Sequence, residues 1–158
     1  MPKYKANKAI VYTVTEDAIS GYASEITGDM ASGFIVKNTN TETVSVDVTK
    51  QWVGKTGESA TIRLLADGVE TQSVELNQAN SWKHSFTDLP KYKANKAIVY
   101  TVTEDAISGY TTEITGDMTS GFVVKNTNTE TVSVDVTKQW VGKTGESATV
   151  NLFADGRR

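Results

Sequence analysis

Residues 44–52 read VSVDVTKQW, and this stretch decides the fold class. Its apolar side chains recur at every second position, at Val44, Val46 and Val48, while the polar side chains between them face the other way. Alternation of this kind indicates a β-strand with one buried face. Lys50 falls on the apolar phase of the strand, so its ammonium group is expected to lie inside the protein.

Two further stretches place a polar residue on an apolar face. Residues 98–104 read IVYTVTE, and their apolar phase ends on Glu104. Residues 122–126 read FVVKN, and their apolar phase reaches Asn126. Each of these polar groups would cost several kcal/mol of desolvation if it were buried without a partner. The pattern therefore predicts that Lys50, Glu104 and Asn126 are buried and need partners.

The rest of the chain follows the same period of two. Thr, Val, Ile and Tyr are abundant, and no long window carries a clean helical stripe. These features predict an all-β fold, and about seven short strands separated by turn signals favour an immunoglobulin-like β-sandwich. The strands expected in one unit are 44–52, 60–65, 69–74, 82–86, 97–104, 110–115 and 121–126.

The chain also repeats itself. Pro2 recurs as Pro90 and Trp52 as Trp140, so the period is 88 residues, and no gap is needed anywhere. Residues 2–70 and 90–158 differ at only nine of 69 positions. A period of this length implies tandem domains and not a solenoid.

Polar stretches mark the expected unit boundaries at residues 39–43 and at their copy, 127–131. Cutting there divides the chain into three parts: a C-terminal half unit (1–43), a complete unit (44–131) and an N-terminal fragment of the next unit (132–158).

Composition excludes several functional classes. Sixteen basic against 19 acidic residues give a net charge of -3, which argues against nucleic-acid binding. The chain has no cysteine and one histidine, His84, so disulfides, thiolate or multi-histidine metal sites and histidine triads are not expected. No apolar run is long enough to insert in a membrane. We expect no cofactor and no metal.

Four pieces of the complete unit carry a family resemblance. The unit resembles the collagen-adhesin B-type (Cna B-type) repeat of Gram-positive surface proteins, and the resemblance covers the whole unit in the right order. The pieces are VTKQW (48–52), WKHSFTDLPKY (82–92), YTVTED (100–105) with GY (109–110), and GFVVKNT (121–127).

The resemblance implies a covalent crosslink. In that family an isopeptide bond joins a lysine of the first strand to an asparagine of the last, promoted by a glutamate, and these roles fall on Lys50, Asn126 and Glu104. A buried lysine can be a neutral nucleophile. A carboxylic acid kept protonated by burial can hydrogen-bond to the amide oxygen and relay protons to departing ammonia. The strand phases by themselves favour a noncovalent cluster of the same three residues.

Copies of the reactive residues lie in the partial units, namely Glu16, Asn38 and Lys138. The resemblance also implies that the first and last strands of a unit run side by side and parallel. Because a parallel connection needs a crossover of a dozen or more residues, Lys50 is expected to pair with Asn126 and not with Asn38. Lys138 could then meet Asn38 of a neighbouring chain, which would be a head-to-tail self-association. Against that hypothesis, such a composite would lack the counterparts of residues 71–89.

The leading functional hypothesis is a structural stalk repeat of an extracellular, cell-wall-anchored adhesin, with the anchor outside this segment and neighbouring repeats as partners. The alternative is a binding domain for a host matrix protein or glycan. Near-identical copies favour the spacer, although repeated binding sites could serve avidity. The only expected chemistry is one self-catalysed reaction per domain, so no enzyme is expected.

Overall fold

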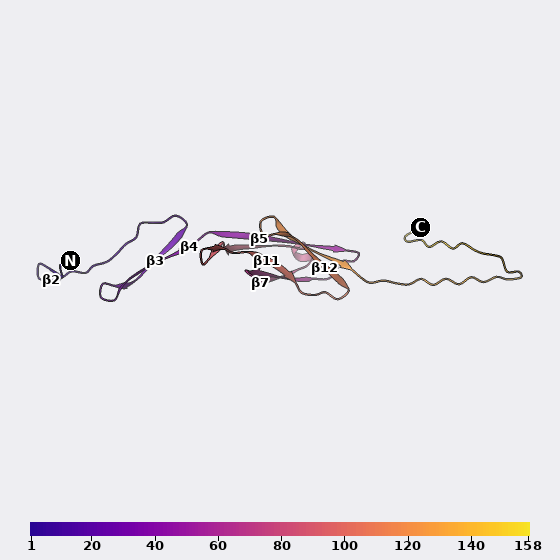
Figure 1. The fold of residues 1–158 in the computed structure, drawn as a ribbon, viewed down its shortest axis with the longest axis horizontal. Coiled ribbons are helices and arrows are strands. Elements are labelled where there is room, and N and C mark those ends of the chain that lie inside the picture. Colours follow the sequence, from indigo (N-terminus) through magenta and orange to yellow (C-terminus); the bar gives the residue numbers. More distant parts are fainter.

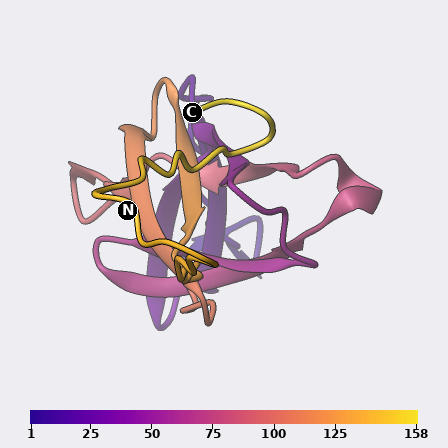
Figure 2. The same cartoon turned by 90° about the vertical axis from the view of Figure 1, so that its right-hand side faces the viewer.

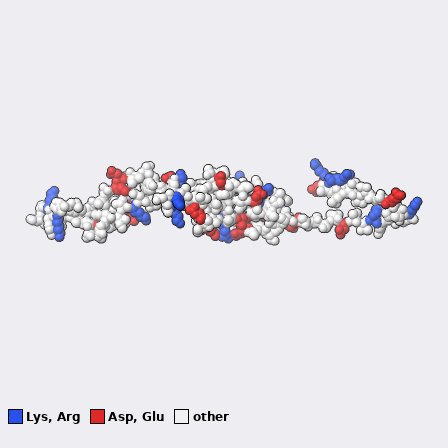
Figure 3. Space-filling view, in the orientation of Figure 1, with Lys and Arg blue, Asp and Glu red and all other residues white.

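The computed structural model describes residues 1–158 and shows an elongated molecule whose two chain ends lie toward opposite ends of its long axis (Figure 1). All long-range sheet structure is concentrated in the central part of the chain. Basic and acidic side chains are interspersed along the visible face without a large patch of one sign (Figure 3). No helix combines the length and the apolar character needed to cross a membrane.

The central body is a sandwich of two sheets, which confirms the all-β prediction. One sheet has the order β12-β13-β5-β8 and the other has the order β11-β6-β7. The strands of the first are β5 (Thr43–Val53), β8 (Lys83–Pro90), β12 (Tyr110–Asp117) and β13 (Gly121–Asn128). Those of the second are β6 (Ala60–Ala66), β7 (Val69–Leu76) and β11 (Tyr100–Glu104).

The first and last strands of the sandwich, β5 and β13, pair in parallel at the middle of the larger sheet, as expected. Their register places Val124 opposite Lys50 and Asn126 opposite Trp52. All other strand pairs are antiparallel. The parallel pair therefore brings residues that are far apart in sequence to one place.

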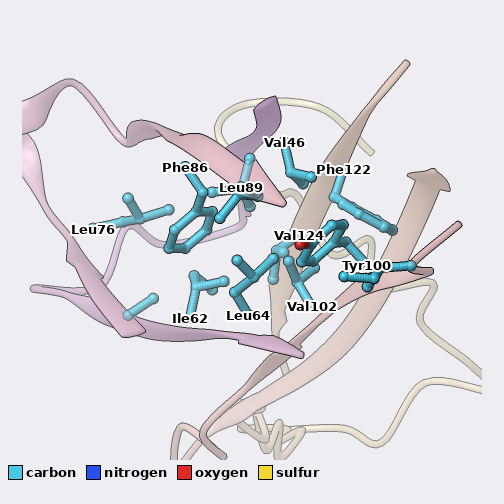
Figure 4. Packing of buried hydrophobic residues seen from close by; sticks show 13 residues of the cluster. Val46, Ile62, Leu64, Leu76, Phe86, Leu89, Tyr100, Val102, Phe122 and Val124 are labelled. Carbon is cyan, nitrogen blue, oxygen red and sulfur yellow. The ribbon is translucent and has the colours of Figure 1, made fainter. Parts of the chain in front are cut away.

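Apolar side chains from both sheets meet between them (Figure 4). Those on β5, β11 and β13 lie on the phases predicted to be buried, Ile98 precedes β11, and β12 contributes none. Counted as whole residues, Lys50 and Asn126 are the polar residues buried as fully as this core, and the side chain of Glu104 is also buried. The core residues are Val46, Val48, Ala60, Ile62, Leu64, Leu76, Phe86, Leu89, Ile98, Tyr100, Val102, Phe122 and Val124.

The N-terminal part forms two isolated hairpins. The first pairs β1 (Tyr4–Lys5) with β2 (Lys8–Ala9), and the second pairs β3 (Tyr22–Asp29) with β4 (Gly33–Asn40). They correspond to β9 (Tyr92–Lys93) with β10 (Lys96–Ala97) and to β12 with β13 in the sandwich. The longer hairpin forms because all of its backbone pairing is local.

The C-terminal part carries no strand, although its sequence copies β5 and β6. Figure 2, a view along the long axis, shows it as an unpaired chain, and its one bridge joins Ala154 to Arg157. Val46 is fully buried, whereas its copy Val134 is 68% exposed. The two valines differ because only the first has partner strands and a facing sheet.

The connection from β4 to β5 is shorter than the predicted linker, since only Thr41 and Glu42 lie outside the strands. Glu42 donates its backbone N–H to Asn40 Oδ1 at 3.1 Å and accepts from Asn40 Nδ2 at 3.2 Å. Lys91 of the sandwich donates to the Glu42 carbonyl at 3.0 Å, and its Nζ lies 3.6 Å from the Glu42 carboxylate. The segment that follows the β3–β4 hairpin is thus tied to the sandwich by hydrogen bonds.

The strand predicted over 97–104 begins later, at Tyr100. Val99 instead exchanges hydrogen bonds with Asp67 in the turn after β6: the Val99 N–H donates to Asp67 Oδ1 at 2.9 Å, and the Asp67 N–H donates to the Val99 carbonyl at 2.8 Å. A 3-10 turn, η1 (Gln78–Asn80), capped by Asn77, was not predicted. Side-chain hydrogen bonding by Asn and Asp produces both departures.

Candidate functional site

Lys50 points inward from β5 into the sandwich, and only 4% of its surface is exposed. Its Nζ donates to the Gln51 carbonyl at 2.8 Å and to the Val124 carbonyl of β13 at 3.3 Å. The nitrogen also lies 3.9 Å from the centre of the Trp52 ring. Burial lowers the pKa of Lys50 from 10.5 to about 8, even though the nearby Glu104 carboxylate acts in the opposite direction.

Aromatic rings build the apolar environment around this lysine. Trp52 packs edge-on against Trp82 and Tyr110, with centroid distances of 5.4 and 5.1 Å. Gly57 makes room for the Trp52 ring, since a Cβ at that position would lie 2.5 Å from it. These contacts keep Trp52 over Lys50 and keep water away from the ammonium group.

Asn126 points inward from β13 and is completely buried. Its amide nitrogen Nδ2 donates to Glu104 Oε1 at 2.7 Å, to Thr112 Oγ1 at 2.9 Å and to the Thr111 carbonyl at 3.2 Å. Its amide oxygen Oδ1 has no hydrogen-bond partner. Because a backbone carbonyl can only accept, the Thr111 carbonyl fixes the side of the amide that carries the nitrogen.

Glu104 reaches the same place from the opposite sheet, at the end of β11. Its side chain is fully buried, and its Oε2 lies 3.7 Å from Lys50 Nζ. Its Oε1 accepts from the amide nitrogen of Asn126. One carboxyl group therefore lies between the amine and the amide, and the three residues predicted to be buried come together from two sheets.

The arrangement suits the transfer of a proton from Lys50 to the amide nitrogen. One carboxyl oxygen faces the amine, and the other faces the nitrogen that would depart as ammonia. The predicted hydrogen bond from Glu104 to the amide oxygen of Asn126 is absent from this geometry. The Thr111 carbonyl and the Thr112 hydroxyl turn the nitrogen, and not the oxygen, toward Glu104.

The copies of these residues are only partly brought together. Asn38 Nδ2 donates to Glu16 Oε1 at 2.7 Å, so this half of the site keeps its geometry while exposed. The hydrogen bond from Asn38, followed by one from Ser24, lowers the pKa of Glu16. Lys138 donates to the Gln139 carbonyl at 2.7 Å and lies 3.9 Å from the Trp140 ring, as Lys50 does with Gln51 and Trp52. Lys138 lies in the C-terminal part without strands. Figure 1 shows this part at the opposite end of the molecule from the N-terminal hairpins.

Thr112 contacts both Glu104 and Asn126 but was not among the site residues predicted from the sequence. A signal for it was present in the repeat comparison, because Thr112 is one of the nine differing positions and its copy, Ser24, keeps the hydroxyl. Gly57 was also missed. No group of three or more side chains that could hold a metal ion occurs in the structure.

The sequence pattern of the Cna protein B-type domain matches residues 1–39 and 46–127, which is more than half of the chain. The chain belongs to the Cna B-type domain family. Domains of this family are structural parts of adhesins and not enzymes. The Cna B-type assignment agrees with the parallel pairing of the first and last strands described above.

Relatives of this Cna B-type chain include the collagen adhesin of Staphylococcus aureus, which is 36% identical over 162 residues. That match covers 94% of this chain but only 13% of the adhesin.

Two crystal structures of the collagen binding protein of S. aureus are also similar to this chain. The pair of B repeat units, B1B2, has 33% identity and a TM-score of 0.60, covering 82% of this chain and 35% of that one. The single B1 unit has 33% identity and a TM-score of 0.53, covering 82% of this chain and 72% of that one.

Proposed function

We propose that the chain is part of the stalk of a surface adhesin, in which each complete unit is locked by a Lys50–Asn126 isopeptide bond. The complete unit spans 44–131, with a half unit before it (1–43) and a fragment of the next unit after it (132–158). The observation that carries the proposal is the single buried carboxyl group of Glu104 that contacts both the amine of Lys50 and the amide of Asn126.

The bond forms by attack of the Lys50 amine on Cγ of Asn126. The neutral Nζ, formed when the ammonium group loses a proton to solvent, bonds to Cγ and passes one of its two remaining protons to Glu104 Oε2. The Cγ–Nδ2 bond breaks as Glu104 delivers a proton through Oε1 to the departing nitrogen, which leaves as ammonia. The carboxylate, no longer paired with an ammonium group, then takes up a proton from solvent, so every hydrogen is accounted for.

The lowered pKa of Lys50 supports this chemistry. At neutral pH a lysine with a pKa of about 8 has a far larger neutral fraction than an ordinary one. Removing the buried charge pair also relieves a desolvation cost, which supplies part of the driving force.

The mechanical role follows from the position of the bond. A pull along the stalk enters the sandwich at the start of β5 and leaves at the end of β13, and these strands lie side by side. A bond between Lys50 and Asn126 carries this force past residues 51–125. The two-residue connection and the Lys91–Glu42 contacts would then transmit the force to the preceding unit.

Single-molecule pulling on the full chain, from its two ends, tests the role directly. The wild-type protein should give no release of residues 51–125. The Lys50→Ala and Asn126→Ala variants should each release roughly 250 Å of additional chain when the sandwich unfolds. An identical release from the wild-type protein would refute the locked stalk.

We also propose a head-to-tail contact between chains, in which Lys138 meets Glu16 and Asn38 of a second copy. The geometries of both half sites match those of the complete unit. The strands that the composite would lack correspond to most of β7 and to β8 up to Leu89, and both are edge strands of their sheets. The parallel pair that holds the reactive residues could still form.

Size-exclusion chromatography and denaturing gels at several protein concentrations test the head-to-tail contact. Crosslinked dimers that disappear in Lys138→Ala but persist in Lys50→Ala would support it. Monomer alone at every concentration would remove it.

The binding alternative is tested separately, by flowing the chain over immobilised host matrix proteins and glycans. The spacer role predicts no saturable binding. Saturable binding by the complete unit would favour the ligand-binding role.

A further inference from the structure

Thr112 lies on β12 directly opposite Asn126 of β13. Its hydroxyl donates to Glu104 Oε1 at 2.9 Å and accepts from Asn126 Nδ2 at 2.9 Å. With the 2.7 Å hydrogen bond from Nδ2 to Oε1, these contacts close a ring of three polar groups. A hydroxyl has one hydrogen to donate, so donation to the carboxylate leaves its lone pairs for the amide.

The donor and the acceptor of each hydrogen bond in the ring are fixed by chemistry. The carboxylate can only accept, and the amide nitrogen can only donate. Only the hydroxyl can both donate and accept, so it can accept from the amide and donate to the carboxylate at the same time. Thr112 itself is largely exposed, and its hydroxyl therefore lies where the buried cluster meets solvent.

The half unit repeats two of these three hydrogen bonds with a different residue. Ser24 lies opposite Asn38 in the β3–β4 hairpin, and its side chain hydrogen-bonds to Glu16. Ser24 and Thr112 differ by a methyl group and share the hydroxyl. The neighbouring difference, Ala23 for Thr111, does not keep a hydroxyl.

We propose that the hydroxyl of Thr112 is a positioning group for isopeptide formation. It holds the Glu104 carboxyl so that Oε1 faces the departing nitrogen while Oε2 faces Lys50. It also holds the amide with Nδ2 toward Glu104, ready to receive the proton. This inference rests on the proposed Lys50–Asn126 bond and adds a residue that neither the sequence pattern nor the crosslink itself identifies.

The test compares the full chain with its Thr112→Val and Thr112→Ser variants. Each is made by cell-free synthesis, samples are quenched in acidic denaturant over time, and the crosslinked fraction is read from the intact mass. Thr112→Val should slow crosslinking roughly tenfold to a hundredfold, as expected for losing one hydrogen bond to a charged group. Thr112→Ser should react at close to the wild-type rate.

Two controls separate positioning from folding. Thr115→Val makes the same substitution at an exposed residue of β12 outside the cluster, and should leave the rate unchanged. In a Lys50→Ala background, where no bond can form, Thr112→Val should still unfold in one cooperative transition, with only the loss of stability expected for one hydrogen bond. Loss of the cooperative transition would assign the slow reaction to misfolding and overturn the positioning role.

The outcomes distinguish this inference from the proposed function. A wild-type rate in Thr112→Val would overturn the role of Thr112 and leave the crosslink intact. Failure of Thr112→Ser to restore the rate would also overturn it, because the hydroxyl would not be the group that matters. Absence of crosslinking in the wild-type chain would remove the proposed function, and this inference with it.

Discussion

Lys50 has two opposing influences on its charge. The surrounding aromatic and aliphatic groups disfavour the ammonium form, whereas Glu104, at 3.7 Å, favours it. Desolvation is the larger effect, so the pKa falls to about 8. The residue is thus held close to the condition that a nucleophilic amine requires near neutral pH.

This pKa predicts how the crosslinking rate depends on pH. Below pH 8 most of Lys50 carries a proton, so the rate should rise with pH as the neutral fraction increases, and should level off above about pH 8. Freshly synthesised chain, incubated at several pH values and quenched in denaturant, gives the rate from intact mass. A rate that does not change between about pH 6 and pH 8 would contradict the role of a neutral Lys50 amine.

Gly57 offers a test of the aromatic cover. In Gly57→Ala the new Cβ would lie 2.5 Å from the Trp52 ring, so the ring must move off Lys50. Water then reaches the amine, its pKa rises toward the ordinary value, and crosslinking at neutral pH should slow several-fold.

The matched control for Gly57→Ala is Gly145→Ala. The same contact exists there at 2.6 Å, but to the ring of Trp140 in the unpaired C-terminal part. The Gly145→Ala variant should form the crosslink at the wild-type rate. If both variants react at the wild-type rate, the Trp52 ring does not set the reactivity of Lys50.

At the scale of elements, the repeat provides two environments for nearly the same sequence. Residues of β5 and β6 form buried strands, whereas their copies at 132–140 and 148–154 form none. Alternation of apolar residues thus indicates which face a strand would bury. It is the pairing with β13 and β8, and the facing sheet, that make the strand.

Leu64 and its copy Leu152 allow the energetic effect of this difference in environment to be tested. Leu64 is completely buried, and its copy Leu152 is 69% exposed. Leu64→Ala should lower the free energy of unfolding by about 2–5 kcal/mol. Leu152→Ala should change it by no more than about 0.5 kcal/mol. Denaturant titration followed by tryptophan fluorescence would measure both, and equal losses would contradict the placement of the core.

Sequence reasoning predicted the sandwich and the meeting of Lys50, Glu104 and Asn126, because each follows from the period-two phase of one strand. It could not predict that Glu104 faces the amide nitrogen. That orientation depends on the Thr111 carbonyl and the Thr112 hydroxyl of a neighbouring strand. Likewise, the late start of β11 depends on a tertiary contact with Asp67 that no local pattern encodes.

At the scale of the whole molecule, the same turn follows β4 and β13. Glu130 and Asn128 repeat the mutual hydrogen bonds of Glu42 and Asn40, with both distances at 3.0 Å. The chain therefore leaves β13 through the same turn by which it leaves β4. Repetition of one turn gives a stalk a regular path from unit to unit.

In limited digestion, trypsin should cut first at lysines and arginines that lie in exposed segments without strands. Lys138 and Lys143 lie in the exposed part that has no strands, so the first cuts should fall there. The sandwich should survive as a resistant fragment that still contains Lys50 and Asn126. Mass analysis of early time points identifies the cuts, and initial cleavage within β5 or β13 would contradict the proposed limits of the complete unit.

The central claim is that Lys50 and Asn126 are joined covalently, and the intact mass of the denatured chain tests it most directly. We predict a mass about 17 Da below the value calculated from the sequence, because one ammonia is lost per bond formed. The loss should be absent in Lys50→Ala and in Glu104→Ala. A wild-type mass equal to the sequence value would instead mean that Lys50, Glu104 and Asn126 form a noncovalent cluster, and the locked stalk would be contradicted.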